Sequence, residues 1–75
     1  MKGGDEMFRN IRAEMTRHQM TAADCAKLLE ISKSAFNKKL RGAYEFRLSE
    51  VATLARHWNC SIDYLAVTYK TGGDN

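Results

Sequence analysis

The side chains best suited to chemistry in this sequence are basic and polar, and most of them gather between residues 32 and 47. This segment has five Lys or Arg residues and one acid, so it carries a charge of +4, while the rest of the +3 chain carries −1. Lysine can donate to the acceptors of guanine, asparagine can form two hydrogen bonds with adenine, and basic side chains pair with phosphates. The segment therefore has the donors that contact with duplex DNA requires, although a solvated helix face can carry the same charge.

Catalysis and metal binding have weaker support. Cys25, Cys60, His18 and His57 could supply four zinc ligands, but they lack the tight paired spacing of a structural zinc site. A Cys–His or Ser–His nucleophile needs a pocket, and 75 residues leave little room for one. We expect reduced cysteines packed as small hydrophobes, no metal or other cofactor, no small-molecule substrate and no enzyme activity.

The composition is that of one small helical domain. A hydrophobic fraction of 44% with 28% charged residues excludes a disordered chain, and 75 residues suit a single domain. There are no prolines, and no glycine lies between Asp5 and Arg41, which favours helices. Because no apolar run could span a membrane and the first residues lack the apolar core of a signal peptide, we expect a cytoplasmic protein without membrane association.

Apolar residues at helical spacing, together with capping residues, predict five short helices around one core. The first covers residues 7–18, and the second begins at a capping box of Thr21 and Asp24 and ends near Leu29. The third covers residues 33–41. Ser32 caps its start, Gly42 ends it, and its inner side carries Phe36 and Leu40.

The fourth and fifth helices complete the predicted core. The fourth covers residues 48–58, ends at Asn59 and has five inward apolar residues, Leu48, Val51, Leu54, Ala55 and Trp58. Ser61 caps the fifth, in which Ile62 and Leu65 point inward. The folded domain is expected over residues 5–70, between a loose arm (1–4) and a tail (71–75).

The second and third helices have the arrangement of a helix-turn-helix, in which the first helix supports the second in the major groove. Ala26 is the small residue needed where the two helices meet, and Ile31 fixes the corner between them. The outer side of the third helix is polar and carries Ser32, Lys33, Ser34, Asn37, Lys38 and Arg41.

Over about residues 8–66 the sequence resembles the Cro and phage-repressor-like helix-turn-helix domains, also called the XRE family. The resemblance rests on the joint spacing of Thr21, Ala26, Leu29, Ile31, Ser32, Ser34, Phe36, Arg41, Gly42, Leu48, Leu54, Ala55, Ser61, Ile62, Asp63 and Leu65. It implies an all-α, compact five-helix, lambda-repressor-like DNA-binding domain. It also implies a sequence-specific transcriptional regulator, a repressor that binds a two-fold operator as a dimer.

The resemblance assigns particular roles to the residues of this sequence. The positions implied to contact bases are Lys33, Ser34, Asn37 and Lys38. The positions implied to contact phosphates are Thr21, Ser32, Arg41 and Arg47. Lys39 joins them because Lys39 and Leu40 depart from the usual order of the family near the end of the third helix, which indicates a slightly rotated helix with Lys39 free to reach a phosphate. Backbone amides near Tyr44 would assist. The Tyr44 side chain itself either touches DNA or packs the loop, and we favour packing.

Two further departures from the family pattern, at Ala22 and Glu30, affect these expectations. Ala22 stands where the family places a phosphate-holding glutamine, so affinity must come from other residues. Glu30 stands where glycine is common before the turn, so it must tolerate an unfavourable backbone angle or reshape the turn.

We expect double-stranded DNA as the partner, bound by a homodimer that pairs through an apolar patch of Tyr64, Val67 and Tyr69. The alternative is a small helical protein-interaction module, such as an antirepressor or antitoxin-like protein, whose basic face binds an acidic protein. Salt-dependent binding with a preference for one duplex sequence separates the two functions.

Overall fold

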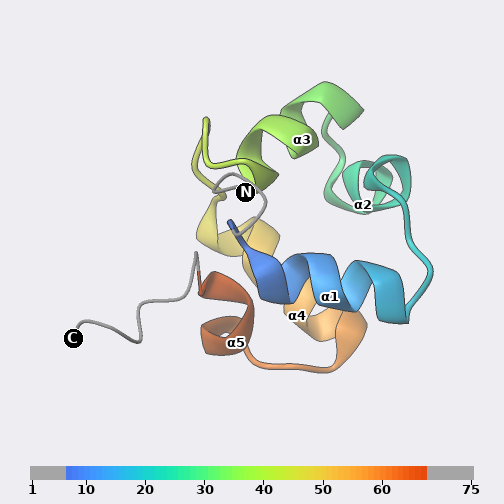
Figure 1. Ribbon diagram of the computed structural model, residues 1–75, viewed down its shortest axis with the longest axis vertical. Helices are drawn as coiled ribbons and strands as arrows, with labels where there is room; N and C mark the ends of the chain where they lie inside the picture. The colour runs from blue at the N-terminus through green and yellow to red at the C-terminus, as the bar shows by residue number, and fades with distance from the viewer. Residues whose placement is uncertain (1–6, 68–75) are drawn as a thin grey trace.

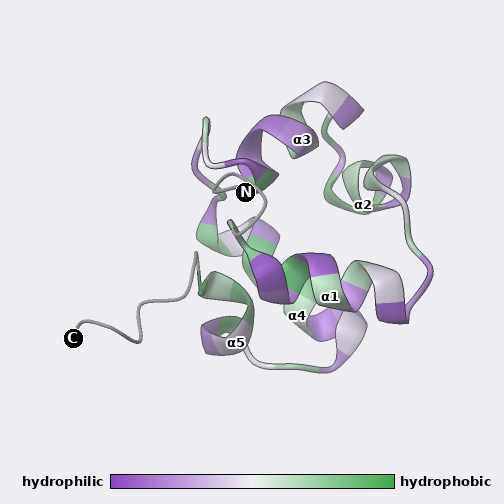
Figure 2. Cartoon of the chain, in the orientation of Figure 1, coloured by the Kyte–Doolittle hydropathy of each residue, from purple (hydrophilic) through white to green (hydrophobic). Residues whose placement is uncertain are grey.

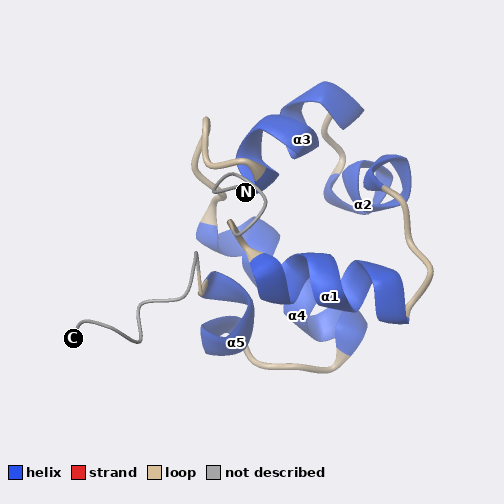
Figure 3. Ribbon diagram, in the orientation of Figure 1, coloured by secondary structure: helices blue, strands red, loops and turns tan. Residues whose placement is uncertain are grey.

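The computed structural model describes residues 7–67, and over this range the chain forms five helices and no strand (Figures 1 and 3). They are α1 (Arg9–Arg17), α2 (Ala22–Leu29), α3 (Lys33–Leu40), α4 (Leu48–Trp58) and α5 (Ile62–Ala66). The expectation of an all-α, five-helix domain is confirmed. The expected arm (1–4), the tail (71–75), Tyr69 and both ends of the expected 5–70 domain lie outside the described residues.

Three helices begin at side-chain caps, as the sequence predicts. Thr21 Oγ1 accepts from the Asp24 N–H (3.1 Å) while the Asp24 carboxylate accepts from the Thr21 N–H (2.9 Å), which completes a capping box. Ser32 Oγ and Ser61 Oγ each accept from the amide three residues later, both at 3.0 Å. These bonds satisfy donors that have no partner within their own helix.

Left-handed residues set several of the remaining helix ends. Glu30 (φ 61°) ends α2 and Asn59 (φ 56°) ends α4, so the strained angle expected at Glu30 is present. Gly42 (φ 88°) follows α3, and a Cβ atom there would collide with the Met7 side chain. Phe8 also has a positive φ (50°), and because of it α1 begins at Arg9, two residues later than expected.

Every helix contributes a fully buried side chain to one core, through Ile11, Cys25, Phe36, Leu54 and Leu65. Leu48 and Ile62 were expected to point inward, and that expectation is wrong. They are 72% and 37% exposed, because each is the first residue of its helix and lies at the rim of the core.

A buried carboxylate on α1 joins the first helix to the last. Glu14 accepts from the Tyr64 hydroxyl (2.9 Å), pairs with Arg17 Nε (3.3 Å) and lies 3.2 Å from His18 Nε2. The Asn10 side-chain amide donates to the Tyr64 carbonyl (2.8 Å) and adds a second contact between α1 and α5.

Candidate nucleic-acid interface

The turn between α2 and α3 is short and closely packed. Glu30 reverses the chain, the Ile31 N–H donates to the Ala26 carbonyl (3.0 Å), and Ser32 then begins α3. Ala26 is buried, which lets the two helices pack directly on each other, and Ile31 is half-buried against the core. The structure therefore contains the helix–turn–helix arrangement that the sequence predicts.

One side of α3 is fixed in the core and the opposite side is accessible. Phe36 and Leu40 are buried, whereas Lys33 and Ser34 are exposed and the other two predicted base contacts are half-buried. At about 100° per residue, positions 33, 37, 34 and 38 fall within about 140° of one another. The structure thus brings the four predicted base-contact residues onto one polar side, and Figure 2 shows α3 as largely hydrophilic.

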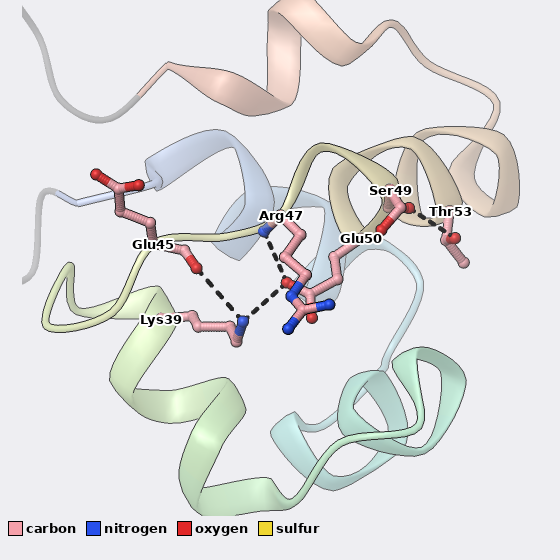
Figure 4. Close-up of polar contacts among 6 residues, drawn as sticks. All are labelled: Lys39, Glu45, Arg47, Ser49, Glu50 and Thr53. Carbon is pink, nitrogen blue, oxygen red and sulfur yellow. Dashed lines mark hydrogen bonds and ion pairs between the residues drawn. The ribbon is translucent and has the colours of Figure 1, made fainter.

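Lys39 does not belong to this accessible side. Its ammonium donates to Glu50 Oε1 (2.9 Å) and to the Glu45 carbonyl (3.3 Å), as Figure 4 shows. The side chains of Lys39 and Glu50 are only 12% and 10% exposed. The expectation that Lys39 is free to reach a phosphate is therefore wrong. Position 39 lies about 100° from Lys38, on the side from which its ammonium reaches Glu50 of α4. Lys33 is, like Lys39, about 60° from Phe36, but it is the first residue of the helix and is exposed.

Glu50 holds α3, the following loop and α4 together. The oxygen that binds Lys39 also accepts from the Arg47 N–H (2.8 Å) at the start of α4. Burial raises the pKa of Glu50, but the hydrogen bonds from the Arg47 N–H and Lys39, and the charges of both residues, outweigh it and lower the pKa below its usual value. The carboxylate is therefore charged at neutral pH and fixes the position of α3 against α4.

The predicted phosphate contacts occupy different environments. Ser32 is exposed, and because its oxygen accepts from a backbone amide, its hydroxyl proton is available to donate. Arg41 ends α3 and Arg47 precedes α4, and both side chains are exposed. At Thr21 the backbone N–H already binds the Asp24 carboxylate, so the hydroxyl is the group left for a phosphate. These roles stay predictions.

Tyr44 is a residue whose position the sequence did not predict. It is 52% exposed, so the choice between packing the loop and touching DNA stays open. The ring lies beside the predicted base contact Lys38, with Nζ 5.4 Å from the ring centroid. The loop sequence carries no periodicity that could have indicated this direction.

The histidines and cysteines considered for metal binding or nucleophilic chemistry include His18, which packs on an aromatic ring, and Cys25, which lies in the core. His18 stacks on Trp58 (6.0 Å between centroids), and Cys25 is fully buried. Burial, with a smaller effect from the Asp24 charge, raises the pKa of Cys25 to about 11. Within residues 7–67 no three His, Cys, Asp or Glu side chains are placed to share a metal ion. None of the helices in that range has the length and apolar character needed to cross a membrane.

Comparison with known proteins adds one finding to this geometry. The family model described as the BetR domain matches residues 5–74, nearly the whole chain. The chain belongs to the BetR domain family. This family comprises small helical domains of a DNA-binding type, so the BetR domain has a regulatory role that involves DNA. No curated protein and no solved structure matches the BetR domain described here. The finer resemblance to the XRE family stays a prediction.

Proposed function

We propose that this BetR domain is a sequence-specific transcriptional regulator of the XRE type, a repressor that inserts α3 into the major groove of duplex DNA. The observation that carries the proposal is the two-sided character of α3. Its inner side is fixed by Phe36 and Leu40, while its outer side presents donors from Lys33, Ser34, Asn37 and Lys38. With its side chains an α-helix is about 10–12 Å in diameter, which fits a groove about 12 Å wide.

Phosphate contacts would come from groups around α3. Ser32 precedes its first residue, Arg41 ends it, and Arg47 lies beyond the loop. Within residues 7–67, Arg41 forms no ion pair, so its charge is available to the DNA backbone, and Lys33 and Lys38, which also form none, keep their charges for base acceptors. These contacts set the affinity and its salt dependence, whereas the outer side of α3 sets sequence preference.

Two copies are proposed to bind a two-fold operator with half-sites about 34 Å apart. The Tyr64 hydroxyl, expected to lie in the pairing surface, instead donates to Glu14. Among the described residues the exposed large hydrophobic side chains are those of Leu48, Ile62, Val67 and Tyr44, and we assign the pairing surface to the first three. Leu48 and Ile62 line an open, largely apolar groove of about 500 Å³. A binding protein of this kind requires no catalytic group.

Selection of bound fragments from a random duplex pool, followed by titration, tests the proposal. A preferred sequence should emerge. Lys38→Ala should reduce the binding free energy for that sequence by about 1–3 kcal/mol and should relax the sequence preference at one base pair. Arg41→Ala should weaken all sequences alike and lower the salt slope by about 1. Arg56→Ala removes an exposed cation from α4 and is the matched control. It should change neither the sequence preference nor the salt slope. Failure to select any sequence, with binding to an acidic protein instead, would favour the interaction-module alternative.

A further inference from the structure

The exposed ring of Tyr44 and the ammonium of Lys38 form a cation–π contact on the accessible side of α3. Lys38 Nζ lies 5.4 Å from the ring centroid, inside the distance of about 6 Å at which the ring quadrupole attracts a cation. The ring is half exposed, so burial in the core does not account for its position. Within residues 7–67, the neighbouring Lys33 has no such aromatic contact, and it provides an internal comparison.

The backbone also brings Tyr44 to Lys38. After α3 the chain reverses at Gly42, whose φ of 88° suits glycine. The amides of Ala43 and Tyr44 then both donate to the Lys38 carbonyl, at 2.9 and 3.3 Å. The carbonyl and the ammonium of Lys38 are therefore both bound by the same loop.

We propose that Tyr44 is a positioning residue that restricts the Lys38 ammonium to one place on the DNA-facing side of α3. The inference rests on the proposed function and adds to it a determinant of specificity. A free lysine has four flexible side-chain bonds and can reach several base or phosphate acceptors. Because the Tyr44 ring restricts the Lys38 ammonium, the ammonium can bind one base acceptor better than the neighbouring acceptors. Specificity is the resulting difference in affinity between duplexes that have and lack that acceptor.

Three substitutions test the inference on the preferred duplex and on duplexes changed at single base pairs. Tyr44→Leu removes the ring but keeps an apolar side chain, Tyr44→Phe keeps the ring, and Lys38→Met removes the cation. Tyr44→Leu should reduce discrimination by about two- to fivefold at the base pair that Lys38→Met relaxes. Tyr44→Phe should match the wild type, and Tyr44→Leu should have no further effect in the Lys38→Met background.

The free protein supplies a readout that does not depend on DNA. In its NMR spectrum the side-chain methylene protons next to the Lys38 ammonium should show a ring-current shift that Tyr44→Phe preserves and Tyr44→Leu abolishes. Because Tyr44 is half exposed, the leucine variant should unfold at the wild-type temperature, which thermal denaturation verifies.

Each contrary result has a distinct meaning. Equal weakening of all duplexes by Tyr44→Leu, or loss of discrimination in Tyr44→Phe, would overturn the positioning role because the ring would not be acting through Lys38. Absence of the ring-current shift would overturn it as well. A wild type that prefers no duplex sequence would overturn the proposed function, whereas a preference unaffected by Tyr44→Leu would overturn this inference alone.

Discussion

Replacement of Lys39 by methionine should leave the Glu50 carboxylate buried without its ion-pair partner. The ammonium and the carboxylate lie 2.9 Å apart, and both side chains are nearly covered. Loss of one partner from a buried ion pair costs about 3–5 kcal/mol. Here the Arg47 N–H still binds the carboxylate and the pair lies at the edge of the core, so Lys39→Met should lower the free energy of unfolding by about 2–3 kcal/mol.

The pH dependence has a definite sign. The pKa of Glu50 is lowered in the folded chain from its ordinary value of 4.5, so its stabilising effect is complete at neutral pH. The effect is lost as the pH falls below 4.5 and through the lowered pKa of the folded state. Without Lys39 that pKa is lowered less, and Lys39→Met should therefore lose less stability than the wild type between neutral and acidic pH.

Urea denaturation followed by the fluorescence of Trp58, the one tryptophan of the chain, measures these differences. In the double variant Lys39→Met/Glu50→Gln, both charges are gone while the glutamine oxygen can still accept from the Arg47 N–H, so stability should return to within about 1 kcal/mol of the wild type. Lys33→Met, an exposed lysine on the same helix, is the control and should change stability by about 0.5 kcal/mol or less.

Two results would refute the reasoning. One is a cost of less than about 0.5 kcal/mol for Lys39→Met, and the other is an equal cost in the Glu50→Gln background. DNA binding gives an independent check at temperatures where the variant is folded. Lys39→Met should leave the salt slope of binding unchanged, whereas Arg41→Ala should lower it by about 1.

Three further predictions concern backbone strain, pairing and thiol reactivity. Glu30→Gly should raise the free energy of unfolding by about 0.5–1 kcal/mol, because glycine adopts the left-handed angle at the end of α2 without a Cβ penalty, and thermal or urea denaturation measures it. Leu48→Ser should weaken dimer formation in sedimentation experiments with little change in stability, since Leu48 is largely exposed, and an unchanged dimer would remove it from the pairing surface. Cys25 should resist alkylation in the folded protein at pH 8, because it is buried and its pKa is about 11, and mass spectrometry should find it modified only after denaturation.

Helix ends were the most predictable part of the fold. Thr21, Ser32 and Ser61 each accept a hydrogen bond from an amide three residues away, so the information lies within four consecutive residues. The left-handed residues Gly42 and Asn59 are likewise recognisable from residue type. The side of α3 that faces the core was also predictable, because Phe36 and Leu40 lie one turn apart.

Contacts between elements were harder to predict. Lys39 binds Glu50 across a loop, and the expectation of a slightly rotated third helix, drawn from a departure from the family pattern, gave the opposite result. Helical periodicity identified Leu48 and Ile62 as apolar but could not show that no neighbouring helix covers them. The turn at Gly42 was recognisable, but the direction of Tyr44 depends on how the loop after it folds back onto the Lys38 carbonyl, which no spacing of side chains indicates.

The bond between Tyr64 and Glu14 has a consequence for how the domain forms. It links groups 50 positions apart, and the fully buried Leu65 closes the same end of the molecule. A growing chain released from the ribosome only as far as α4 would lack both. Contacts so distant along the sequence make assembly a concerted event that waits for α5. A fragment lacking α5 should therefore be short-lived in the cell, and the domain should become competent only once α5 has been synthesised.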